Sequence, residues 1–260
     1  MDHNISKESC KVDPFLRKLL GSDYKHIPFE KLSVSTATID VRLIEGCNIA
    51  YTTLFSLLQI ETSSSKEQKK PPGTIFAGRC GSEIRGSPPT DAKSSLKNCM
   101  MIWMWLSDKC VNMKVYHGNV HITGCKTADH AAEAIRYLQM HLQLLQTDEY
   151  PLYDQFPYCV DFDIHMINYN FSINVGIDLT KFDLFFNRHY YTLGFSPYNP
   201  NVCATHMTVS FPMYSMKFTL NDNGQISMCT KGSTFEGASQ NVCDGYGAFY
   251  VILEQYKRNP

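Results

Sequence analysis

Two stretches of the chain follow one plan: YHGNVHITGCKTADHAAEAIRYL (residues 116–138) and NDNGQISMCTKGSTFEGASQNVC (residues 221–243). Each has a turn with a glycine, Gly118 or Gly224, and then a short strand in which apolar and polar residues alternate. A segment with Thr, Ser or Gly and a helix follow. A second match in apolar pattern, from Ile39 and from Ile167, lies upstream of each stretch. The chain therefore reads as a duplicated α+β unit. Because no catalytic constellation is evident, we expect a binding protein and not an enzyme.

The composition indicates a folded protein with a substantial core. The 260 residues are 43% hydrophobic and 12% aromatic, which suits one large domain or two fused small ones. The net charge is −1, so the total charge favours no nucleic-acid partner. Lys and Arg gather between residues 66 and 97, however, whereas residues 151–260 hold six of them against nine acids. We therefore expect any attraction to phosphates in the first half.

The cysteines predict an intracellular, reducing environment. Ten are present, none in a C-x-x-C pair, as is typical of reduced and mostly buried thiols. No run of about 18 apolar residues and no secretory leader is found. Cys203-x-x-His206 is half a zinc motif without its other half, and His117, His121 and Cys125 are too far apart along a strand for one ion. We expect no metal and no cofactor.

The order of expected elements is the same in both halves: strand, short helix, long loop, at least three strands and a long helix. Residues 1–33 form an appendage with one short helix from Asp13 to Gly21, residues 34–147 the first repeat, 148–157 a linker and 158–257 the second repeat. Residues 59–97 are expected to be a mobile loop, with one hairpin around 74–84. The remaining strands are expected at 34–45, 100–106, 111–117, 119–125, 161–173, 205–211, 215–220 and 225–230, and the short helices at 50–58 and 178–187.

The two long helices carry the clearest periodic signals. Apolar residues recur at helical spacing in residues 129–146, where Asp129 favours the N-terminus. In residues 234–256, Ser233 and Glu236 form a capping box, and Val242 begins a buried stripe. The fold class expected is α+β: a two-repeat saddle, in which a curved antiparallel sheet carries both long helices on its convex face. Its concave face is then left open for a ligand.

The sequence VYHGNVHITGCK (residues 115–126) resembles the motif that opens the long helix in the TATA-binding protein family. Gly118, Thr123, Gly124 and Lys126 fall on the family pattern, while the second copy keeps Gly224 and departs from it at Cys229. The stretch HMINYNF (residues 165–171) resembles divergent relatives of that family in large nucleocytoplasmic DNA viruses. The resemblance covers roughly residues 34–257. For a viral protein it implies the host cytoplasm or nucleus, or packaging in the virion.

The resemblance implies a concave sheet that grips double-stranded DNA in the minor groove, with Phe pairs wedged between base steps. Here the first-half Phe positions fall on Asn98 and Val115, and the second-half wedge falls on Phe218 or Leu220. Thr123 and Cys229 match the Thr that lies on the groove, and strand alternation adds their neighbours. The family Arg for phosphate falls on Met104. The DNA-binding residues thus implied are Lys109, Met113, Val115, Asn119, His121, Thr123, Lys126, Phe218, Leu220, Gln225, Ser227 and Cys229.

Three functions remain open from the sequence. The first is a transcription factor that binds promoter DNA as a monomer and recruits RNA polymerase through a factor-IIB-like partner, with Tyr190 and Tyr191 as its docking surface. The second is a scaffold protein that keeps the saddle and uses its sheet for a protein partner. The third is an enzyme with a site not visible in the sequence. Trp103 and Trp105 are interpreted as core or rim residues.

Overall fold

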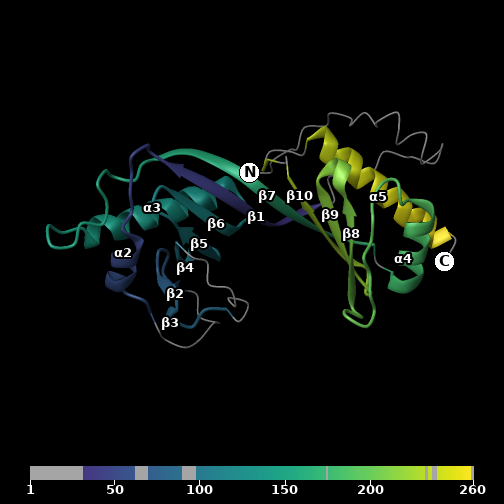
Figure 1. The fold of residues 1–260 in the computed structure, drawn as a ribbon, viewed down its shortest axis with the longest axis horizontal. Coiled ribbons are helices and arrows are strands. Elements are labelled where there is room, and N and C mark those ends of the chain that lie inside the picture. The colour runs from purple at the N-terminus through teal and green to yellow at the C-terminus, as the bar shows by residue number, and fades with distance from the viewer. Residues whose placement is uncertain are drawn as a thin grey trace. The chain divides into compact units, whose positions relative to one another are not determined.

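The computed structural model describes residues 32–61, 70–89, 98–173, 175–231, 234–235 and 239–258. The chain divides into two compact units, Thr36–His165 and one that includes Met166–Pro260, and each is described by itself (Figure 1). The division falls inside a strand and not in the expected linker at 148–157. The expected helix at 13–21, the capping box of Ser233 and Glu236, and much of the 59–97 loop lie outside the described residues.

The first unit contains a short helix, a long helix and an antiparallel sheet. In chain order the elements are β1 (Ser33–Leu43), α2 (Tyr51–Leu57), β2 (Ile75–Cys80), β3 (Glu83–Gly86), β4 (Met100–Trp105), β5 (Cys110–Val115), β6 (Asn119–Cys125) and α3 (Ala128–Leu145). The strands lie in the order β3-β2-β4-β5-β6-β1, with antiparallel pairing throughout. The expected hairpin around 74–84 is confirmed as β2 and β3.

The second unit repeats this order with fewer strands. Its elements are β7 (Cys159–Ser172), α4 (Leu179–His189), β8 (His206–Phe211), the 3-10 helix η3 (Pro212–Tyr214), β9 (Met216–Asn221), β10 (Gln225–Thr230) and α5 (Gln240–Arg258). The order is β7-β10-β9-β8, antiparallel throughout. Among the described residues only one bridge, Phe195 to Ser210, stands where β2 pairs with β4 in the first unit. The expected start of the last helix at 234 is wrong, since α5 begins at Gln240.

The helices cover one face of the sheet in each unit. In the first unit, Val120 and Ile122 of β6 are fully buried, as are Ala131 and Ala134 of α3. In the second unit the ring of Phe218 in β9 stacks on that of Phe249 in α5, with centroids 3.9 Å apart and planes inclined by 10°. Burying one such side chain stabilises the fold by roughly 1.5–3 kcal/mol, so these faces hold each unit together.

The pairing register gives the true equivalence of the two units. Ile39 pairs with Ile122 and Tyr169 pairs with Met228, while Ile167 pairs with Thr230. The counterpart of Ile39 is therefore Tyr169, and the match of Ile39 with Ile167 in the sequence is two residues out of register. Apolar alternation has a period of two, so such a slip keeps the same face and leaves no signal in the pattern.

Gly124 forms a β-bulge near the end of β6. Its φ is +101°, and the register with β1 shifts there, from Thr38 opposite Thr123 to Ala37 opposite Cys125. The extra residue turns Cys125 into the core, where burial raises the pKa of its thiol to about 12. The Thr-Gly-x-Lys motif thus has a structural role: it contains the bulge and connects β6 to α3. In β10, Thr230 enters the core by plain alternation, without a glycine.

Candidate nucleic-acid interface

The face of each sheet that carries no helix is the candidate interface. On it, a row of cross-strand neighbours in the first unit joins Asp40 of β1, His121 of β6, Lys114 of β5 and Met101 of β4. We call these four residues the charged row. The equivalent row of the second unit, which we call the neutral row, joins Asn170 of β7, Ser227 of β10, Thr219 of β9 and Thr208 of β8.

The charged row is organised around the Asp40 carboxylate. The imidazole Nδ1 of His121 donates a hydrogen bond to Asp40 Oδ1, and Nδ1 of His165 lies 3.6 Å from Asp40 Oδ2. Next to this cluster, Arg42 and Asp161 form an exposed ion pair at 3.5 Å. A carboxylate in the middle of the face opposes the approach of phosphates, so this part of the interface is electrostatically mixed.

The outer part of the first unit's helix-free face is not open surface. Met101 and Trp103 of β4 are only 7% and 8% exposed, and Ala77 of β2 is fully buried beside them. With Cys99 they form a small apolar cluster, against which Phe76 and Tyr116 pack. This confirms the interpretation of Trp103 as a core residue. The open part of the face is therefore limited to β1, β5 and β6.

The neutral row presents short polar side chains without charge. The Ser227 hydroxyl donates to Asn170 Oδ1 at 2.9 Å. Asn170 is exposed, and the other three side chains are half-buried. An adjacent row of Asn168, Cys229, Lys217 and Ser210 adds one cation. Burial raises the pKa of the Cys229 thiol, an effect that Lys217 and Lys231 partly offset, and its Sγ contacts Met166 Sδ at 2.8 Å.

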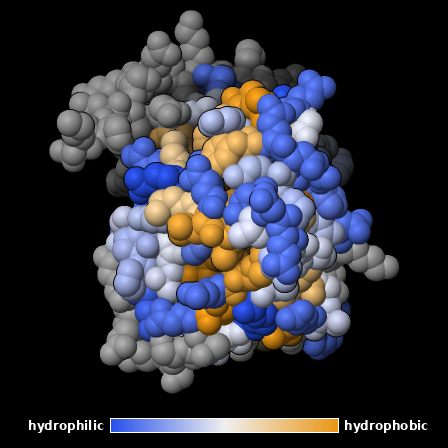
Figure 2. Space-filling model, turned by 90° about the vertical axis from the view of Figure 1, so that its left-hand side faces the viewer, coloured by the Kyte–Doolittle hydropathy of each residue, from blue (hydrophilic) through white to orange (hydrophobic). Residues whose placement is uncertain are grey.

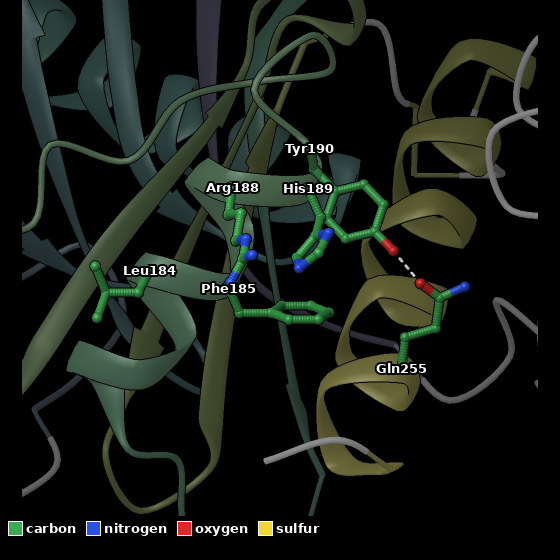
Figure 3. A pocket seen from close by; sticks show the side chains of 6 residues that line it. All are labelled: Leu184, Phe185, Arg188, His189, Tyr190 and Gln255. Atoms are coloured by element: carbon green, nitrogen blue, oxygen red, sulfur yellow. Dashed lines mark hydrogen bonds between the residues drawn. The ribbon is translucent and has the colours of Figure 1, made fainter.

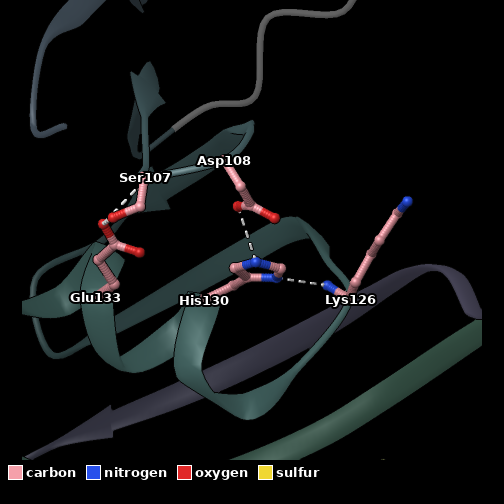
Figure 4. Close-up of polar contacts among 5 residues, drawn as sticks. All are labelled: Ser107, Asp108, Lys126, His130 and Glu133. Carbon is pink, nitrogen blue, oxygen red and sulfur yellow. Dashed lines mark hydrogen bonds and ion pairs between the residues drawn. The ribbon is translucent and has the colours of Figure 1, made fainter. Parts of the chain in front are cut away.

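Two lysines meet where the turn after β4 touches the start of α3. His130 in α3 accepts from the Lys126 backbone N–H at 3.0 Å, and its Nε2 donates to Asp108 at 3.0 Å (Figure 4). The Glu133 carboxylate accepts from the Ser107 hydroxyl at 2.6 Å and so fixes the same turn. Burial, and next the charge of Lys126, lowers the pKa of Lys109. The charges of Lys109 and Lys126 thus repel each other at this turn.

Four of the residues implied by the family resemblance are wrong as DNA contacts. They lie on the helix-covered face with no exposed surface, since strand alternation turns them into the core: Met113, Val115, Phe218 and Leu220. The alternating pattern in CVNMKV and MKFTLN carried this signal in the sequence. The remaining eight lie on the helix-free face of a strand or in a turn at the end of one: Lys109, Asn119, His121, Thr123, Lys126, Gln225, Ser227 and Cys229.

Other residues of the interface were missed in the sequence. Asp40, Asn168, Asn170, Thr208 and Thr219 lie on the helix-free face beside residues that were identified. Alternation in HMINYNF, with Ile, Tyr and Phe turned inward, could have found the two Asn residues.

The two tyrosines of the predicted docking surface lie in different environments. Tyr190 is only 6% exposed and donates its hydroxyl hydrogen bond to Gln255, whereas Tyr191 is 73% exposed.

Two surface grooves lie away from the helix-free faces. One, of about 510 Å³, lies between α4 and α5 and is lined by Leu184, Phe185, Arg188, His189, Tyr190 and Gln255 (Figure 3). The other, of about 520 Å³, lies in the first unit between α3 and residues 59–75, with Met140 and Leu144 exposed on its wall. Figure 2 shows that end of the first unit, where apolar residues gather in a band between polar ones.

The described part of the chain shows no other obvious kind of site. Within it, no group of three His, Cys, Asp or Glu side chains is placed to hold a metal ion. No described helix combines the length and apolar character needed to cross a membrane.

Comparison with known proteins identifies the fold. No protein-family model and no curated protein sequence matches the chain. Among solved structures, the chain is similar to the TBP of Methanococcus jannaschii, with a TM-score of 0.52 and 11% sequence identity. The match covers 86% of this chain and 99% of that protein. At this identity the likeness concerns the fold, and it confirms the expected α+β fold of the TATA-binding protein class.

Proposed function

We propose that this chain is a transcription initiation factor of the TATA-binding protein kind, which binds double-stranded promoter DNA in the minor groove through its helix-free sheet faces. The observation that carries the proposal is the neutral row. Its hydroxyl and amide groups are short, uncharged donors and acceptors on an open sheet face. The minor groove offers mainly the acceptors N3 of adenine and O2 of thymine, which such donors match.

Phosphate contacts are assigned to lysines at the edges of the face. Lys109 and Lys126 lie together in the first unit, while Lys114 and Lys217 lie on the sheet faces themselves. Each lysine that neutralises a phosphate releases counterions, so binding is sensitive to salt. Four contacts would give a slope of log affinity against log salt of about −3 to −4.

The proposed complex bends its DNA less than a protein that wedges aromatic rings between bases. Neither row carries an exposed aromatic side chain, and the two candidate wedges of the second unit are buried. Unstacking a base step costs a few kcal/mol, which an inserted ring offsets. Without that compensation, a strongly kinked duplex is disfavoured.

The test uses base pairs that separate the two grooves. A labelled A·T-rich duplex is compared with one in which A·T pairs are replaced by I·C pairs. These pairs keep the minor-groove pattern of A·T and take the major-groove pattern of G·C. We expect equal affinity for these two duplexes and weaker binding to a G·C duplex at about 50 mM salt. A loss of affinity on I·C substitution would assign recognition to the major groove.

Recruitment of transcription machinery is the finer part of this proposal. The exposed Tyr191 follows the buried Tyr190, and together with the aromatic residues near it suits a factor-IIB-like partner that bridges to RNA polymerase. Tyr191→Ala is expected to weaken that recruitment without changing DNA affinity. Equal loss of both activities would point to misfolding. As in the divergent relatives of large DNA viruses, such a factor would act where the viral genome is transcribed.

A scaffold function is the second candidate, and the charged row favours it. Asp40 sits in the centre of the first unit's face, and Arg42 there is already paired with Asp161. A face with paired charges suits a protein partner as well as it suits DNA. If the purified chain binds no duplex at about 50 mM salt, where phosphate contacts are strongest, the scaffold function replaces the DNA function.

A further inference from the structure

The groove between α4 and α5 has an apolar wall, formed by side chains of α4 that do not turn into the core. Phe182 and Phe186 turn into the core, where Phe182 meets Tyr256 edge-on at 5.1 Å. Leu184 is left 65% exposed on the outer side of α4. Figure 3 shows Phe185, His189 and Tyr190 reaching towards α5, whose Gln255 points back and accepts from the Tyr190 hydroxyl. This hydrogen bond fixes one wall of the groove.

The same groove is positively charged at its rim. Arg188 and His189 are exposed residues of the last turn of α4, where the helix dipole favours cations. None of the six lining residues is acidic. No carboxylate of the described residues forms an ion pair with Arg188. A partner's carboxylate would therefore meet a guanidinium that is not already neutralised within the described chain.

The end of the corresponding short helix in the first unit is capped by a side chain of the same unit. Its helix α2 has seven residues against eleven in α4. The guanidinium of Arg85, from β3, donates to the carbonyl oxygens of Phe55 and Leu58 at the end of α2, the latter at 2.7 Å. In the second unit, α4 runs further and ends in Arg188 and His189 beside the groove. The cation at the end of the short helix thus comes from a strand in the first unit and donates to the helix carbonyls, whereas in the second unit it belongs to the helix itself and lines the groove.

We propose that the α4–α5 groove docks an acidic peptide segment of a partner protein. An apolar side chain of the peptide packs on Leu184 and Phe185, while its carboxylates contact Arg188 and His189. Charge-assisted hydrogen bonds from a guanidinium to a carboxylate supply orientation, and the apolar contact supplies area. The groove lies between two helices and not on the helix-free sheet face, so the peptide does not compete with the proposed DNA contacts.

The test measures fluorescence anisotropy of a labelled twelve-residue peptide in which Asp alternates with Leu and Phe. The full chain is titrated at low salt, with a peptide in which Lys replaces every Asp as the control. We expect the acidic peptide alone to bind. Arg188→Glu should weaken that binding by about tenfold or more, since it converts attraction into repulsion. Lys181→Glu is the matched control, because it makes the same charge change at the exposed other end of α4; it should change the affinity less than twofold.

A second variant tests the apolar part. Leu184→Ala removes exposed side-chain area without changing charge or core packing. It should therefore weaken the binding of the acidic peptide several-fold while the thermal unfolding curve stays unchanged. The proposal is overturned if the acidic peptide fails to bind the wild-type chain. It is equally overturned if Arg188→Glu and Lys181→Glu weaken binding alike, or if Leu184→Ala has no effect. DNA affinity measured on the same variants stays at the wild-type value under this proposal.

Discussion

The charged row and the neutral row occupy equivalent places in the two units and differ in chemistry. The cross-strand pair Asp40–His121 in the first unit corresponds to Asn170–Ser227 in the second. Both pairs are joined by a side-chain hydrogen bond. One pair, however, places a carboxylate on the face and the other an uncharged amide. The backbone geometry of a sheet is therefore kept, while its surface is free to change.

This difference changes where DNA recognition is expected. Charge counts in the sequence placed the attraction to phosphates in the first half, and the resemblance placed protein docking in the second. The structure adds that the first unit's open face is narrowed by the buried Trp103 cluster and contains Asp40. The second unit offers a row of four neutral hydrogen-bonding groups. We therefore assign groove reading mainly to the second unit and phosphate contact to both.

The largest expected effect concerns the two hairpin glycines that look equivalent in the sequence. Gly224 has φ +82°, and a Cβ there would lie 2.1 Å from the Val175 carbonyl oxygen. A Cβ on Gly118 would lie 3.6 Å from its closest neighbour, the Cys47 carbonyl oxygen, and its φ is not in the left-handed region. Gly224→Ala should lower the unfolding free energy by about 2–3 kcal/mol, and Gly118→Ala by less than about 0.5 kcal/mol. Denaturant unfolding with equal losses for both variants would contradict this.

The next effect concerns the lysine pair of the first unit. Changing Lys109 and Lys126 together to Ala should reduce the slope of log affinity against log salt by about 2, since each phosphate contact contributes roughly 0.9. The matched control changes Lys181 and Arg188 to Ala, which removes the same charge from α4. If the slope fell equally in both double variants, the total charge of the protein and not a local phosphate contact would determine the salt dependence of DNA binding.

A smaller effect is expected in thiol reactivity. Burial raises the pKa of Cys229 on the helix-free face, whereas a hydrogen bond from the backbone of His206 lowers the pKa of the partly exposed Cys203. The thiolate is the reactive form, so at pH 7 Cys203 should react faster with iodoacetamide. This difference should shrink as the pH rises and Cys229 also ionises. A bound A·T-rich duplex should slow the labelling of Cys229 several-fold and leave Cys203 unchanged; equal protection of both would count against the interface.

The elements and their order followed from the sequence because the apolar pattern of each strand and long helix is strong. Leu138 and Leu142 of α3, and Phe249 of α5, lie in the core as their helical spacing predicts. The same alternation places Val115 and Phe218 on the face towards the helices, and the contact residues implied by the family resemblance conflict with it at these positions. The face of a strand residue was thus predictable for these two positions.

Other features could not be predicted from one sequence. The bulge at Gly124 changes the face of Cys125, and a period-two pattern cannot show that a residue has been inserted. The two-residue slip between β1 and β7 is invisible for the same reason. The burial of Met101 and Trp103 depends on contacts from beyond their own strand. Their apolar character favoured the core without indicating the face.

The most direct test of the account exchanges the central residue between the two rows. Asn170→Asp places the first unit's carboxylate in the neutral row and keeps an oxygen that accepts from Ser227, while Asp40→Asn makes the reverse change. The dissociation constant for an A·T-rich duplex is measured for both variants and the wild type. Asn170→Asp should weaken binding about tenfold or more, and Asp40→Asn should tighten it by up to a few-fold. If Asn170→Asp binds as the wild type does, or Asp40→Asn binds more weakly, the neutral row of the second unit is not the surface that reads the groove.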